Sequence, residues 1–146
     1  MEPLAEELKK EVNAATPLLL AISEGDAARP RADGGWSRKQ ILGHLIDSAA
    51  NNHQRFVRLQ FETNLILPGY QQNYWVDTQH YQDRSWTDLV MLWRAYNLHL
   101  AHVVARINPA TLGNVWKFTE GDLTLEEIAT DYPRHMRHHL QQISGR

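Results

Sequence analysis

The residues best suited to chemistry in this sequence are histidines, and two of them lie four positions apart. His135 and His139 belong to a segment near the C-terminus, and His44 interrupts an apolar stretch much earlier in the chain. On a helix, residues four apart share one face, so the imidazoles of His135 and His139 can bind one metal ion. A third histidine from another helix would complete a site of three nitrogen ligands. Because such a site leaves coordination positions open to water or substrate, it indicates chemistry rather than a purely structural metal.

The remaining histidines are weaker candidates for metal ligands. His138 lies about 100° around the helix from the histidine that follows it, so we expect it behind the ligands or in contact with substrate or a neighbouring chain. His53 comes nine residues after His44 and points to the opposite side of that helix, where we expect it at the surface. His99 and His102 form a further pair, but no third partner is evident. We expect this pair at the surface as well.

A polar stripe continues from His44 along one face of an otherwise apolar segment. It contains Asp47 or Ser48, Asn51 and Arg55. Because the segment is otherwise apolar, these polar groups are expected to be buried, and buried polar groups need hydrogen-bond partners. Two explanations stay open: a metal-bound imidazole whose other nitrogen donates to a neighbouring carboxylate or hydroxyl, or a polar network in the core without a metal. Asp47 and Asn51 are candidates for groups that orient the ligands. Arg55 either neutralises an acidic co-substrate or pairs with a buried carboxylate.

Composition sets the class of protein. The 146 residues, 42% apolar and 22% charged, predict one globular domain over residues 1–146. A net charge of -2 and scattered basic residues argue against nucleic acid as a partner. The longest apolar run is too short to cross a membrane and the N-terminus does not resemble a signal peptide, so we expect a cytoplasmic protein. With no cysteine, disulfides and protein thiol nucleophiles are excluded, and a metal must use nitrogen and oxygen ligands.

Hydrophobic periodicity predicts an all-α protein with four long helices. Two of the starts carry capping boxes, Ser37 with Gln40 and Thr124 with Glu127. Pro17 should bend or split the first helix, and Pro133 should bend the last one just before His135. The expected helices cover residues 3–22, 37–61, 85–107 and 124–144.

The connection between the second and third helices, residues 63–84, is long for a compact bundle and rich in tyrosine, glutamine and tryptophan. Its aromatic side chains either form the wall of a pocket or close one end of the core. Residues 116–118 predict a short extended piece. We expect substrate specificity to depend on the crossover and on the segment from Val115 to Gly121.

Two histidine-bearing blocks resemble the DinB-like superfamily. They are GWSRKQILGHLIDS at residues 35–48, followed by Asn51 and Arg55, and HMRHHLQQI at residues 135–143. The resemblance covers nearly the whole chain. The branch it resembles most closely contains proteins classed as metal-dependent hydrolases together with bacillithiol S-transferases. The fold that this resemblance implies is a four-helix bundle with a long crossover between helices two and three.

The resemblance also implies a divalent metal, nickel or zinc, held by His44, His135 and His139, and a homodimer. Characterised members transfer low-molecular-weight thiols such as bacillithiol, mycothiol or glutathione to electrophiles, or isomerise substrates with the help of a thiol. Three functions follow for a small-molecule substrate. They are, in order, a metal-dependent thiol S-transferase, a metal-dependent hydrolase of a small substrate, and a metal-binding stress-response protein without catalysis.

Overall fold

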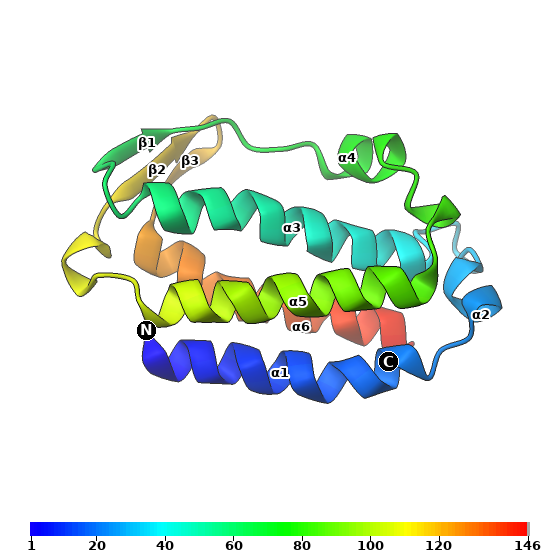
Figure 1. The fold of residues 1–146 in the computed structure, drawn as a ribbon. Helices are drawn as coiled ribbons and strands as arrows, with labels where there is room; N and C mark the ends of the chain where they lie inside the picture. The colour runs from blue at the N-terminus through cyan, green and yellow to red at the C-terminus, as the bar shows by residue number, and fades with distance from the viewer. Residues whose placement is uncertain (146) are drawn as a thin grey trace.

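The computed structural model of the chain describes residues 1–145 and is dominated by four long helices (Figure 1). These helices are α1 (Glu2–Leu20), α3 (Arg38–Arg58), α5 (Trp86–Ala105) and α6 (Leu125–Ser144). Helices α1 and α6 run in one direction along the bundle, and α3 and α5 run in the other (Figure 1). Each of α1 and α3 packs against both α5 and α6. The four long helices predicted from the periodicity and the four-helix bundle implied by the family resemblance are therefore confirmed.

Shorter elements occupy the connections between the long helices. They are α2 (Glu24–Ala28), β1 (Asn64–Ile66), α4 (Gln72–Thr78), the 3-10 turns Tyr81–Asp83 and Pro109–Thr111, β2 (Val115–Phe118) and β3 (Gly121–Thr124). The strands form one small sheet in the order β1-β2-β3, with β1 parallel and β3 antiparallel to β2. This sheet is an addition to the predicted all-α architecture. Its strands are too short to show an alternating pattern, although the extended piece expected at residues 116–118 is part of β2.

The predicted helix starts are confirmed by their capping bonds. Ser37 accepts a hydrogen bond from the backbone N–H of Gln40, whose side chain accepts in return from the Ser37 N–H at 3.0 Å. Thr124 and Glu127 form the same reciprocal pair at the start of α6. These bonds satisfy N–H groups that a helix leaves free in its first turn. They fix where α3 and α6 begin, and with that the positions of the histidines along both helices.

Both internal prolines lie within continuous helices. Pro17 belongs to the last turn of α1, which continues to Leu20, so the split that we considered there does not occur. Pro133 is buried inside α6, which runs without interruption to Ser144. Among residues 1–145, no helix is both long and apolar enough to cross a membrane.

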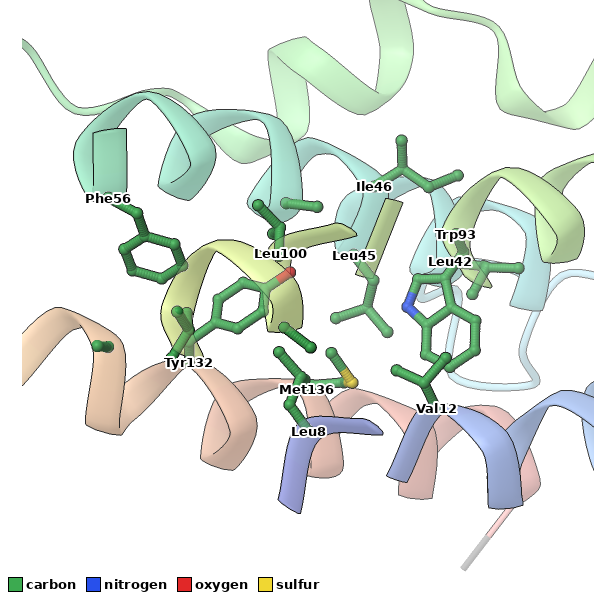
Figure 2. Packing of buried hydrophobic residues seen from close by; sticks show 14 of the residues in the cluster. Leu8, Val12, Leu42, Leu45, Ile46, Phe56, Trp93, Leu100, Tyr132 and Met136 are labelled. Atoms are coloured by element: carbon green, nitrogen blue, oxygen red, sulfur yellow. The ribbon is translucent and has the colours of Figure 1, made fainter. Parts of the chain in front are cut away.

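The core lies between the apolar stripes of the four long helices (Figure 2). Each helix contributes large side chains that are almost completely buried: Leu8 and Val12 from α1, Leu42, Leu45 and Phe56 from α3, Trp93 and Leu100 from α5, and Tyr132 and Met136 from α6. Burial of this much apolar surface is the main stabilising contribution to the fold.

The long crossover covers the side of α3 that faces away from this core. Because α3 and α5 are parallel, residues 59–85 must return along the bundle, and they pass over α3 (Figure 1). Lys39 holds the end of the crossover that precedes α5. Its ammonium group donates to the backbone carbonyls of Arg84 at 2.6 Å and Gln82 at 3.1 Å. As a result α3 is buried on both sides over residues 41–49. The polar stripe that begins at His44 is thereby enclosed.

Candidate metal centre and adjoining pocket

The structure brings together the three histidines implied as ligands, His44 from α3 and His135 and His139 from α6. The centre of the His44 ring lies 5.2 Å from that of His135 and 4.6 Å from that of His139, and the two α6 rings lie 4.6 Å apart. The Nε2 atoms of His44 and His135 face each other at 3.2 Å. One ring nitrogen from each histidine lies within 4.8 Å of the other two. Three nitrogen donors therefore converge on one point between the helices.

The chemistry of this donor set fits a divalent metal. Burial, followed by the proximity of the other two imidazoles, lowers the pKa of His44 from 6.5 to about 3. Burial also lowers the pKa of His135 to about 4 and lowers the pKa of His139. All three rings are thus neutral at neutral pH and keep a lone pair for a metal. With zinc–nitrogen bonds of about 2.0–2.1 Å, tetrahedral geometry separates two nitrogens by about 3.3 Å, close to the observed His44–His135 separation.

His139 is oriented by Gln142, one turn further along α6. The Gln142 Oε1 lies 2.8 Å from His139 Nδ1, so this nitrogen donates to the amide and Nε2 is left to face the cluster. The amide nitrogen of Gln142 in turn donates to His138 Nε2 at 3.1 Å. His138 is exposed, and its ring centre lies 5.0 Å from that of His139. His138 thus lies behind His139, and its role beside a ligand, a substrate or a neighbouring chain remains a prediction.

Asp47 is buried one turn after His44 but does not accept from that imidazole. Its Oδ1 accepts hydrogen bonds from the Tyr81 hydroxyl at 2.6 Å and from the Gln79 amide at 2.7 Å. Its Oδ2 and the Nδ1 of His44 are both buried and have no hydrogen-bond partner among residues 1–145. Burial raises the pKa of the Asp47 carboxyl. Asp47 therefore links the crossover to α3 by hydrogen bonds, and one of its carboxylate oxygens has no partner in the described part of the chain.

Asn51 has a local role in the structure. Its side-chain amide donates to the backbone carbonyl of Asp47 at 2.9 Å, which is a bond within α3.

Two aromatic rings lie near His44 in addition to those of the cluster. They belong to Trp36, at 5.3 Å between ring centres, and to Tyr70 of the crossover, at 6.5 Å.

A pocket of about 800 Å³ adjoins the cluster at His135. Its walls come from α3, the crossover, the sheet and the first half of α6, and they include Ser48, Asn52, Arg55, Tyr70, Trp116, Leu123, Ile128 and Tyr132. Of the two roles considered for the aromatic crossover, the structure shows the first, because Tyr70 lines the pocket. Tyr81 is buried against the side of α3 at Gly43, not at an end of the core. The volume suits a small organic molecule.

Arg55 lies in this pocket without the carboxylate partner that one of our two explanations required. Its guanidinium carbon lies 3.7 Å from the centre of the Trp116 ring, and Nη1 donates to the side-chain oxygen of Asn52 at 3.2 Å. No carboxylate in the described part of the chain forms an ion pair with it. Burial lowers the pKa of Arg55 to about 10, so it stays charged at neutral pH.

The other histidines lie away from the cluster. His99 and His102 are exposed on α5, as expected. His53 is half-buried rather than fully at the surface, because it packs against α5. Its Nδ1 lies 3.1 Å from the Tyr96 hydroxyl, and its ring centre lies 5.2 Å from that of His99.

Sequence reasoning missed several residues of the site, above all Gln142, Gln79 and Tyr81. The spacing of three between His139 and Gln142 was the available signal, because it places both on one helical face. Gln79 and Tyr81 reach Asp47 only through the path of the crossover, which no local pattern in the sequence determines.

Known proteins resemble this chain in sequence and in structure. A protein of Bacillus mycoides (strain KBAB4), named "Putative metal-dependent hydrolase", is 26% identical over 80% of this chain and 67% of its own length. A protein of the same name from Bacillus cereus (strain 03BB102) is 23% identical over 96% of this chain and 81% of its own. The solved structure of YfiT from Bacillus subtilis, described as a probable metal-dependent hydrolase with an unusual four-helix bundle topology, matches with a TM-score of 0.84. That match has 21% identity and covers 98% of this chain and 83% of YfiT, which shows a common fold.

The family model for the DinB superfamily matches residues 7–143, which is nearly the whole of the chain. This match includes both histidine-bearing blocks and all three residues of the cluster. The chain therefore belongs to the DinB superfamily.

Proposed function

We propose that this protein is a metal-dependent thiol S-transferase, in which a divalent metal held by His44, His135 and His139 activates a low-molecular-weight thiol for attack on an electrophile. The observation that carries this proposal is the convergence of three neutral imidazoles beside a pocket of about 800 Å³. The chain contains no cysteine, so a thiol nucleophile must come from a co-substrate.

In this proposal, one set of residues holds the metal and another set contacts the substrates. A dication bound by three neutral ligands keeps its charge and lowers the pKa of a thiol or water beside it. Gln142 fixes the tautomer of His139 and so presents its lone pair to the cluster. Tyr70 and Trp116 provide aromatic walls against which the organic part of a substrate can pack. The crossover covers the His44 side of the centre and limits the access of bulk water.

Hydrolysis of a small substrate is the second candidate, and Asp47 is the observation that favours it. Its buried Oδ2 has no partner within residues 1–145, and burial raises the pKa of the carboxyl. A carboxylate with these properties can accept a proton from a water molecule that attacks a substrate. The names of the relatives from Bacillus mycoides and Bacillus cereus point in the same direction.

The two candidates differ in their need for a thiol. We would load the protein with zinc or nickel and follow the consumption of monobromobimane with glutathione, bacillithiol or mycothiol, and the hydrolysis of nitrophenyl acetate without any thiol. Thiol transfer predicts turnover only when thiol and metal are both present, and its loss in His44→Ala. The control is His99→Ala, which alters an exposed histidine of α5 and should keep full activity.

The alternative outcomes are equally informative. Metal-dependent turnover of the ester without thiol would select the hydrolase. Metal binding that raises thermal stability, with no turnover of any substrate, would select the third expectation, a metal-binding stress-response protein. The choice between nickel and zinc, a homodimeric state and a cytoplasmic location remain predictions.

A further inference from the structure

Arg55 is a buried cation whose hydrogen-bonding capacity is largely unused. Arg55 is only 6% exposed. Among the N–H groups of its guanidinium, only one, on Nη1, has an acceptor within residues 1–145. The N–H on Nε is buried and has no acceptor in that part of the chain. Leaving a buried charged donor unpaired is costly, so such a group normally has an anionic partner. The other arginine of this part of α3, Arg58, has one, because it pairs with Glu62 at 2.8 Å.

The surroundings of Arg55 hold the guanidinium in place but do not neutralise it. Trp116 lies against its face at 3.7 Å, and Asn52 accepts one of its hydrogens. Three carboxylates of α6 line the pocket, Glu126, Glu127 and Asp131, and none forms an ion pair with Arg55. Glu126 is exposed, and the other two have partners of their own. Glu127 accepts from Thr124 in the capping box, and Asp131 accepts from Arg134 Nε at 2.8 Å.

Arg55 and the metal centre belong to one cavity, because the pocket that contains Arg55 is also lined by His135. Along α3, the eleven residues from His44 to Arg55 correspond to a rise of about 16 Å. Helical side chains lean toward the N-terminus of their helix, so the long Arg55 side chain extends toward the centre. One molecule can therefore reach both the metal and the guanidinium.

We propose that Arg55 is the binding site for a carboxylate of the substrate or thiol co-substrate, held at the far end of the pocket from the three histidines. The planar guanidinium matches a carboxylate in shape and charge, and Trp116 packs against one face of it, which leaves the N–H groups at its edge for a ligand. This inference rests on the proposed function in treating the pocket as the substrate site. It adds that the molecule bound there is anionic and spans the distance from the metal to Arg55.

The test uses cobalt-substituted protein and pairs of simple thiols. Binding of a thiolate to cobalt gives a charge-transfer absorption, from which a Kd is obtained for mercaptocarboxylates of increasing chain length and for the neutral mercaptoalcohols of matching length. At the chain length that spans the site, we expect the carboxylate to bind about tenfold or more tightly than the alcohol. Arg55→Gln should abolish this preference, and Arg55→Lys should keep part of it.

Controls separate loss of the anion site from loss of the fold. Arg58→Gln, on the same helix but outside the pocket, should keep the preference unchanged. Metal content and thermal denaturation show whether the Arg55 variants retain the centre and the fold. Equal Kd values for both thiol classes at every length in the wild type, or a preference that survives in Arg55→Gln, would overturn the inference while thiol binding itself stands.

A second measurement decides the matter if no thiol binds to the metal, which would count against the proposed function. In metal-free protein labelled with ¹⁵N, the Arg55 Nε–H resonance is followed during titration with succinate. A saturable shift of that resonance, absent for Arg58, supports the anion site independently of any thiol chemistry. No shift up to high succinate concentration would overturn it.

Discussion

The ring of Tyr81 packs directly on the backbone of α3 at Gly43, the residue before His44. A Cβ atom built on residue 43 would overlap that ring. The absence of a side chain at this position therefore allows the crossover to lie against α3 and allows the Tyr81 hydroxyl to reach Asp47. The crossover thus lies in direct contact with the part of α3 that contributes His44 to the histidine cluster.

Replacing Gly43 with alanine should destabilise the protein. The added methyl group forces Tyr81 away from α3, and overpacking of this kind lowers the free energy of unfolding by about 1–3 kcal/mol. Denaturant unfolding measures the effect. Gly25→Ala is the control, because an added Cβ there has open space and α2 is helical at that position, so stability should be unchanged or slightly higher. Equal stability of the two variants would contradict the packing described here.

Removing the Tyr81 hydroxyl should test the hydrogen bond separately from the packing. In Tyr81→Phe the buried Asp47 carboxylate loses one of its two donors, the hydroxyl at 2.6 Å, which should lower the free energy of unfolding by about 1–3 kcal/mol. Tyr74→Phe, at an exposed position of α4, should have no effect. If the two phenylalanine variants unfold at the same denaturant concentration, the Tyr81–Asp47 bond makes no net contribution.

Gln142 should matter for metal affinity although it is not a ligand. Gln142→Leu removes the acceptor that fixes the His139 tautomer, and loss of such partners typically weakens metal binding about 10- to 100-fold. Competition with a chelator measures the Kd for zinc. The neighbouring exposed Gln141, changed to leucine, provides the matched control and should bind zinc as the wild type does. Unchanged affinity in Gln142→Leu would exclude this role.

The stability of the metal-free protein should fall in mildly acidic solution. The pKa values of His44 and His135, about 3 and about 4 in the folded chain, lie below the usual 6.5. Between about pH 4 and 6.5 the unfolded chain therefore binds more protons than the folded chain, and the free energy of unfolding decreases as the pH falls, on the order of 1 kcal/mol per pH unit. Unfolding curves from pH 7 to pH 5 measure the slope. His135→Gln should flatten it, and an equally steep slope in that variant would contradict the assignment.

The sequence alone was sufficient for the bundle and for part of the centre. Capping residues such as Ser37 and Thr124 act locally, so the starts of α3 and α6 could be predicted from neighbouring residues. The spacing of His135 and His139 likewise places them on one face by helix geometry alone. That His44 joins them depends on how α3 packs against α6, and this followed from the resemblance to a family.

The surroundings of the centre could not be predicted in the same way. The path of the crossover depends on the contact between Tyr81 and Gly43, and the sequence shows only a glycine and a distant tyrosine. The two explanations for Arg55 differ only in whether a carboxylate lies nearby, which is a question of tertiary structure. Strands as short as β1 carry too few residues for a pattern.

Metal content tests the central proposal most directly. Plasma mass spectrometry on untagged protein would compare the wild type with the double variant His135→Ala, His139→Ala and, as a control, with His99→Ala, His102→Ala on the exposed face of α5. The three-histidine centre predicts stoichiometric nickel or zinc in the wild type and the control, and its loss in the first variant. No bound metal in the wild type after reconstitution, or equal metal in all three proteins, would contradict it.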